Sequence, residues 1–164
     1  KLAGKRDISW VADTLIAFLQ SNLPAKLNEL DAEYNDGIVL EDIPNEFMFV
    51  SEKLNPPGYP MLVIIAEGTD LNPFDGQSRY GIEHHELTIA IALISRGEDE
   101  EFLKRRTMRT IRGIEEVLLE NITLNNAVND VICLSKEYSP LVGDDSNAFY
   151  LQEGQLSIRV ETME

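Results

Sequence analysis

Residues 80–120 contain the clearest change of hydrophobic period in the chain. Between His84 and Leu93, the odd positions after His85 are apolar and the even positions are polar or small, as in a strand with one buried face. From about Glu98 the apolar positions recur at helical spacing. Those expected to face the sheet are Leu103, Thr107, Ile111, Ile114 and Leu118, and those on the opposite side are Arg105, Arg109, Arg112 and Glu116. We therefore predict a long helix packed on the odd face of strand 85–93.

The N-terminal region is predicted to be helical. Apolar residues at helical spacing run from Asp7 to about Gln20, and either Asp7 or Ser9 suits the cap. Pro24 is expected to begin a second helical segment, because proline suits a first helical position. The Asn-Asp-Gly triplet at 35–37 supplies a stop for that segment.

The remaining chain is predicted to be mainly extended. MLVIIA at 61–66 lacks alternation, which indicates a strand buried on both faces and central in its sheet. The turn-rich segment 69–79 is expected to be a hairpin loop leading to strand 84–93. Residues 129–140 and 149–163 complete the sheet, with a bulge expected at Gly154.

These elements define an α+β fold. We expect a mixed, mainly antiparallel β-sheet of about four strands, with an N-terminal helix and a long helix packed on it. The length of 164 residues suits one compact unit with its own core. Residues 1–164 are therefore predicted to form a single domain.

The charge balance argues against nucleic acid as a ligand. The chain has 29 acidic and 14 basic residues, for a formal net charge of −15. Such a surface repels phosphate backbones and anionic membranes, although acidity is also common among soluble proteins. The apolar runs are far shorter than the about 20 residues of a spanning helix. The single cysteine, Cys133, lies in an apolar run, which favours a buried, inert thiol.

His84, His85 and Glu86 are the strongest candidates for catalysis or metal binding. Adjacent strand residues point to opposite faces, so the two imidazoles are poorly placed to share a metal. A structural role is the favoured interpretation, and a small hydrolase or metal-binding enzyme is the alternative. Turn chemistry is the favoured account of the loop carboxylates Asp70, Asp75, Asp144 and Asp145. No catalytic residue, metal ligand or cofactor is therefore assigned.

The long helix concentrates positive charge in an acidic chain. Its five basic residues are Lys104, Arg105, Arg106, Arg109 and Arg112. Two i,i+4 spacings, Glu101 with Arg105 and Arg112 with Glu116, are typical of solvent-facing ion pairs. The alternative hypothesis is that Arg105, Arg109 and Arg112 form a positive stripe that meets an acidic surface on a neighbouring copy.

The strand-to-helix unit EHHELTIAIALISRGEDEEFLKRRTMRTIRGIEEVL, together with chain length and element order, resembles the tail-terminator, or tail-completion, proteins of long-tailed bacteriophages. The likeness extends from the WVADTLIAFLQ helix to the closing QLSIRVETM strand. It implies a structural virion protein without enzymatic activity. Such a protein forms a ring, typically hexameric, that caps the head-proximal end of the tail tube, ends tube polymerisation and joins the tail to the neck or head.

The resemblance also implies partners and a location. The partners are further copies of the chain, the tail tube protein and a neck or head-completion protein, and DNA passes through an acidic lumen without specific binding. The protein would be assembled in the host cytoplasm and reside in the virion tail, with no role for a membrane. The loops 68–79 and 139–148 are expected to project as contact elements. The predicted partner-interface residues are Asp70, Asp75, Arg79, Arg105, Arg109, Arg112, Asp144 and Asp145.

Three rival functions fit the same sequence. One is another head-tail connector or the tube cap of a contractile injection machine. Another is the hydrolase or metal-binding enzyme built on His84 and His85. The third is an acidic adaptor that binds one partner as a monomer, which solution mass would distinguish from a ring.

Overall fold

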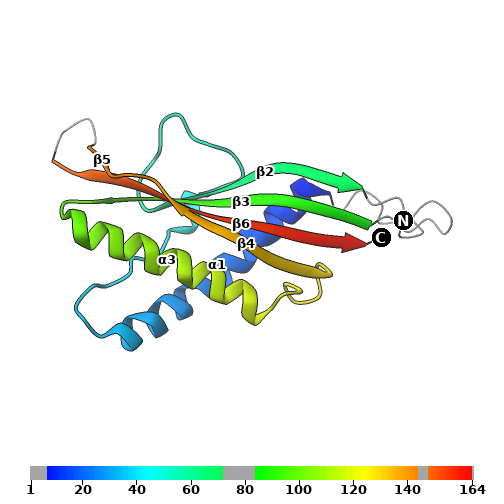
Figure 1. The fold of residues 1–164 in the computed structure, drawn as a ribbon, viewed down its shortest axis with the longest axis horizontal. Helices are drawn as coiled ribbons and strands as arrows, with labels where there is room; N and C mark the ends of the chain where they lie inside the picture. Colours follow the sequence, from blue (N-terminus) through cyan, green and yellow to red (C-terminus); the bar gives the residue numbers. More distant parts are fainter. Residues whose placement is uncertain (1–6, 72–83, 144–147, 164) are drawn as a thin grey trace.

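A computed structural model describes residues 7–71, 84–143 and 148–163, with the side chains of Asp70, Leu71, His84 and Met163 left out (Figure 1). The helices are α1 (Ile8–Tyr34) and α3 (Glu100–Glu120), with a 3-10 turn η1 (Asn45–Phe47). The strands are β1 (Met48–Phe49), β2 (Met61–Leu71), β3 (His84–Gly97), β4 (Asp130–Tyr138), β5 (Val142–Gly143) and β6 (Tyr150–Met163).

The strands form one mixed sheet in the order β1-β2-β3-β6-β4, with β5 also paired to β6. Only β1 and β2 run parallel, and the other pairs are antiparallel. The predicted α+β class and mainly antiparallel sheet are therefore confirmed. The sheet has six strands rather than about four. The sequence did not predict β1 and β5, because a strand of two residues is too short to show a hydrophobic period.

The predicted position of the 61–66 strand was only partly right. It is buried on both faces: Leu62 and Ile64 belong to the main core, whereas Met61 and Val63 join Ala92 in a smaller cluster. In the sheet, however, β2 lies second from an edge, and β3 takes the central place. A continuous apolar run indicates that both faces of a strand are covered. It does not indicate where the strand lies in the order of the sheet.

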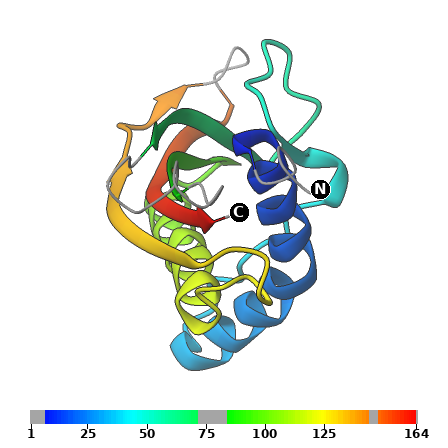
Figure 2. The ribbon, with the colours of Figure 1, turned by 90° about the vertical axis from the view of Figure 1, so that its right-hand side faces the viewer.

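Both helices cover the same face of the sheet (Figures 1 and 2). The β3 residues of the predicted odd face, Leu87, Ile89, Ile91 and Leu93, are fully buried in the main core. The predicted sheet-facing residues of α3 are buried as well, and they are Leu103, Thr107, Ile111, Ile114 and Leu118. The predicted packing of the long helix on this strand is confirmed.

The N-terminal region is one helix rather than two. Its cap is Asp7, whose carboxylate accepts a hydrogen bond from the Trp10 N–H at 2.9 Å. Pro24 lies inside the helix, where it removes one backbone hydrogen bond. The buried stripe continues past it from Leu19 through Leu23 to Leu27, and burying these side chains holds the helix together across the proline.

Gly154 is not a bulge, as its pairing with both β3 and β4 is regular there. A Cβ at this position would lie 2.8 Å from Ile111 Cγ1 and 3.0 Å from Thr107 Cγ2. The glycine therefore allows α3 to approach β6 closely. The register shifts instead between Ala66 and Gly68 of β2 and between Cys133 and Ser135 of β4.

Candidate protein interaction site

An open hollow of about 400 Å³ lies beside α3, and we call it the basic hollow. It is lined by Tyr34, Arg105, Met108, Arg109, Arg112, Lys136 and Tyr138. Spacings of three and four residues put the α3 members on one side of that helix. Lys136 and Tyr138 pair with Leu156 and Gly154, so they point from β4 toward the helix-covered face of the sheet. Tyr34, the last residue of α1, completes the lining.

Arg109 forms the inner wall of the basic hollow. Its two terminal nitrogens donate to the Asp36 carboxylate at 2.9 and 2.6 Å, and its guanidinium lies 3.8 Å from the centre of the Tyr34 ring. Only 8% of Arg109 is exposed. The hydrogen bond from Arg109 is the main cause that lowers the pKa of Asp36 to about 2. The same contact raises the pKa of Arg109.

Local backbone geometry brings Asp36 to this place. The flanking residues Asn35 and Gly37 both have positive φ, at 45° and 84°. Asparagine and glycine accept the left-handed region at low cost, so the chain reverses directly after α1. The helix stop predicted at 35–37 is therefore confirmed, and it carries the carboxylate that binds Arg109.

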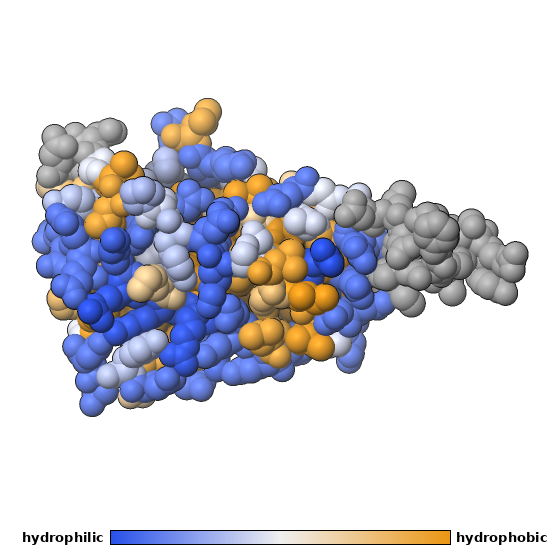
Figure 3. Space-filling model, viewed as in Figure 1, coloured by the Kyte–Doolittle hydropathy of each residue, from blue (hydrophilic) through white to orange (hydrophobic). Residues whose placement is uncertain are grey.

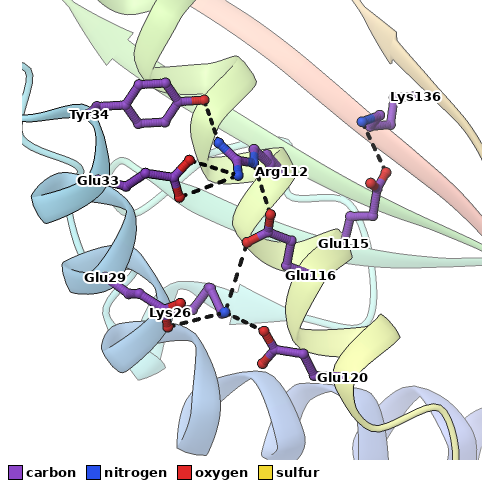
Figure 4. A network of polar contacts seen from close by, with 9 residues as sticks. All are labelled: Lys26, Glu29, Glu33, Tyr34, Arg112, Glu115, Glu116, Glu120 and Lys136. Carbon is purple, nitrogen blue, oxygen red and sulfur yellow. Dashed lines mark hydrogen bonds and ion pairs between the residues drawn. The ribbon is translucent and has the colours of Figure 1, made fainter.

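Arg112 is anchored to α1 and to its own helix (Figure 4). Its Nε donates to Glu116 at 2.9 Å, its Nη1 to the Tyr34 hydroxyl at 2.8 Å, and its Nη2 to Glu33 at 3.1 Å. The contacts with Tyr34 and then Glu33 raise the pKa of Arg112. All three nitrogens are thus engaged within the chain.

Arg105 is the most available arginine of the basic hollow. Its side chain is 50% exposed and donates through Nε and Nη2 to Glu101, itself 75% exposed. Within the part of the chain that the structure describes, its Nη1 has no partner. An exposed pair of this kind contributes about 0–1 kcal/mol, so the guanidinium is readily shared with another protein. Both predicted i,i+4 pairs, Glu101 with Arg105 and Arg112 with Glu116, are confirmed.

The prediction that all three arginines share one exposed face is wrong for Arg109. The structure does bring Arg105, Arg109 and Arg112 together on the basic hollow. However, α3 has two covered sides, because the sheet lies under one and α1 lies against another. Arg109 faces the end of α1, so its charge is satisfied by Asp36 inside the chain.

Two basic residues outside the predicted stripe also form ion pairs with carboxylates of α3. Lys136 lies on the edge strand β4, and its ammonium pairs with Glu115 at 3.0 Å while 39% of the side chain stays exposed. Lys26 is almost fully buried between α1 and α3, where it contacts Glu29, Glu116 and Glu120 (Figure 4). The sequence signal for Lys136 was a charge within a strand. For Lys26 the sequence offered only the i,i+3 spacing with Glu29, since Glu116 and Glu120 are distant in the chain.

The other candidate residues give no assembled site within the described part of the chain. Asp75, Arg79, Asp144 and Asp145 lie outside the described residues, and Asp70 is described only as backbone in β2. His85 is half-buried on β3, and the neighbouring His84 is described only as backbone. Among the described residues, no group of three His, Cys, Asp or Glu side chains is placed to hold a metal.

Cys133 is half-buried at the margin of the main core. Desolvation raises the pKa of its thiol, which keeps the sulfur protonated at neutral pH. Within the described segments, neither helix has the length and apolarity needed to cross a bilayer.

Exposed apolar residues gather over β4 and the C-terminal half of α3 (Figure 3). They include Leu119, Ile122, Ile132 and Leu134, each between 38% and 52% exposed. Ile132 pairs with Arg159 and so points to the sheet face away from the helices. Met108, Tyr34 and Tyr138, by contrast, line the basic hollow itself beside its cations. The basic hollow therefore suits a partner that presents carboxylates together with apolar side chains.

Comparisons with known proteins add little to this picture. No protein-family model matches the chain, and no curated protein matches it. One solved structure that it resembles is a chain from the virion of a native gene transfer agent particle, at 10% identity and a TM-score of 0.33. That match covers 87% of this chain and 94% of the other. At this score the likeness does not establish a common fold or function.

Proposed function

We propose that residues 1–164 are a tail-terminator-like domain, a structural virion protein of a long-tailed bacteriophage. Copies of the chain form a ring, hexameric in this proposal, on the head-proximal end of the tail tube. The ring ends tube polymerisation and presents the surface that joins the tail to the head or neck. The protein acts by binding and catalyses nothing.

The basic hollow is the observation that carries this proposal. Four cations, Arg105, Arg109, Arg112 and Lys136, line one open depression on a chain whose net charge is −15. Opposite charges on one protomer favour contact between copies, and arginine's planar fork also orients that contact. Met108, Tyr34 and Tyr138 supply apolar area at the same place.

The mechanism is physical. One face of the ring copies the surface that a tube ring offers to the tail tube protein, and the other face lacks the surface that would accept another tube ring. An acidic lumen lets DNA pass without adhesion. The predicted contacts at Asp70, Asp75, Arg79, Asp144 and Asp145 belong to the same proposal, as does the location in the virion tail.

A tube-capping assay tests the proposal. Purified tail tube protein of the same phage is polymerised with the wild-type chain or with an Arg105→Glu/Lys136→Glu variant. We expect the wild type to stop tube growth and the variant to lose this effect while its circular dichroism spectrum stays unchanged.

The matched control is Lys104→Glu, which makes the same kind of charge change on an exposed α3 residue outside the basic hollow. It should cap tubes as the wild type does. Tubes that grow equally long with and without the wild-type chain would contradict the proposed function.

A further inference from the structure

An acidic segment lies at the edge of the sheet opposite β4. Residues 41–54, here called the acidic segment, contain the carboxylates Glu41, Asp42, Glu46 and Glu52 and the single basic residue Lys53. All four acidic residues are exposed. Glu41 pairs with Arg106 at 2.8 Å, whereas Asp42, Glu46 and Glu52 form no ion pair within the described part of the chain.

The acidic segment begins against α3, where Glu41 pairs with Arg106, and it then leads to the edge of the sheet opposite β4. The acidic segment contains β1, the edge strand at one end of the order β1-β2-β3-β6-β4, and the basic hollow borders β4 at the other end. Figure 2 shows β4 on the left and the residues around β1, in cyan, on the right. The part of the acidic segment around β1 therefore lies away from the basic hollow of its own protomer, and two copies placed edge to edge can bring these two surfaces together.

We propose that the basic hollow of one copy binds the acidic segment of a second copy. This inference rests on the proposed self-assembly and names the surface that the hollow meets. The charges are complementary. Among the described residues, Asp42, Glu46 and Glu52 have no ion-pair partner and the Nη1 of Arg105 has none either, and Lys136 remains partly exposed. Arg109 and Arg112 hold the hollow in shape through their contacts within the chain.

Apolar groups match on the same two surfaces. The loop after β1 projects from the sheet (Figure 1), and it carries Val50 at 51% exposure and Leu54 at 99%. The basic hollow offers Met108 at 46% exposure and Tyr138 at 37%. A leucine held fully in water on a projecting loop gains free energy when it is buried, so Leu54 serves as the apolar anchor beside the ion pairs.

Such a contact joins two different surfaces and is therefore heterologous. A pair joined in this way still presents one free hollow on one copy and one free segment on the other, so the same contact repeats, and it closes into a ring where the rotation between copies allows. A two-fold dimer, in which the same patch meets itself, would need no acidic segment. The contact thus predicts directional assembly and separates it from ordinary dimerisation.

Charge-reversed variants test the contact. Arg105→Glu/Lys136→Glu alters only the basic hollow, and Asp42→Lys/Glu46→Lys alters only the acidic segment. In sedimentation velocity at low salt, the wild type should self-associate. Each variant alone should have a dissociation constant at least about tenfold higher, because like charges meet at the contact. An equimolar mixture of the two variants should regain association, since every contact again pairs opposite charges.

Two further variants separate the outcomes. Leu54→Ser should weaken association without any change of charge, and Lys104→Glu should leave it unchanged. Association that survives reversal of the acidic segment but not of the hollow would overturn this inference and leave the proposed function standing. Failure of the mixture to associate would also overturn it. A wild type that stays monomeric at every concentration would overturn the contact between copies itself.

Discussion

The Arg109 guanidinium donates two hydrogen bonds to the Asp36 carboxylate, at 2.9 and 2.6 Å, across 73 positions of sequence. The pair joins α3 to the turn that follows α1, and the Tyr34 ring stacks on the same guanidinium. It therefore shapes the basic hollow and fixes the C-terminal end of α1 against α3. The stabilisation depends on the charge of Asp36, which makes it sensitive to acid.

We expect Asp36→Asn to remove a pH-dependent part of the stability. The pKa of Asp36 is lowered from 3.8 to about 2, so its contribution is fully present above pH 3.8 and is lost as the pH falls toward 2. Denaturant unfolding should show the wild type to be more stable than Asp36→Asn at neutral pH, with the difference shrinking through this window. In an Arg109→Met background the effect of Asp36→Asn should depend much less on pH, because the largest cause of the lowered pKa of Asp36 is gone. A difference that grows as the pH falls would contradict the assignment.

Ile111→Ala should destabilise the protein by about 2–5 kcal/mol, because it leaves a cavity between α3 and the sheet. Ile111 is fully buried, whereas Met108 on the same helix is 46% exposed. Met108→Ala is therefore the control and should change the free energy of unfolding by about 0.5 kcal/mol or less. Equal stability of Ile111→Ala and the wild type would show that the helix does not pack as described.

Gly154→Ala should also destabilise the protein, by about 1–3 kcal/mol, because the new methyl group overlaps Ile111 and Thr107. Combining it with Ile111→Ala should cost less than the sum of the two single changes, because alanine lacks the Cγ1 atom that the new methyl group meets at 2.8 Å. The matched control is Gly68→Ala in β2, where a Cβ meets nothing within 4 Å. Thermal unfolding of these variants and of the wild type provides the measurement, and a Gly154→Ala variant as stable as Gly68→Ala would refute the close approach.

The sequence was sufficient for features set by local period. Alternation in β3 and helical spacing in α3 each predicted which residues are buried, since one covered face leaves a repeating pattern. The continuity of α1 was missed because Pro24 is a local signal for a helix start, whereas the packing that overrides it comes from Leu23 and Leu27 against distant parts of the chain.

The candidate site was predictable only in part. Charge and spacing pointed to Arg105, Arg109 and Arg112, and the structure places all three on the basic hollow. The burial of Arg109 depends on where α1 ends, and no periodicity within α3 reports that. Lys136 was missed for a similar reason, because strand order decides that β4 lies beside this side of α3.

Solution mass of the purified wild-type chain, measured together with negative-stain images of tubes to which it has been added, tests the central claim most directly. The account predicts closed rings of uniform mass, and a ring at one end of each tube whose growth has stopped. A chain that remains monomeric at every concentration, leaves tube ends bare and lets tubes grow to full length would contradict it.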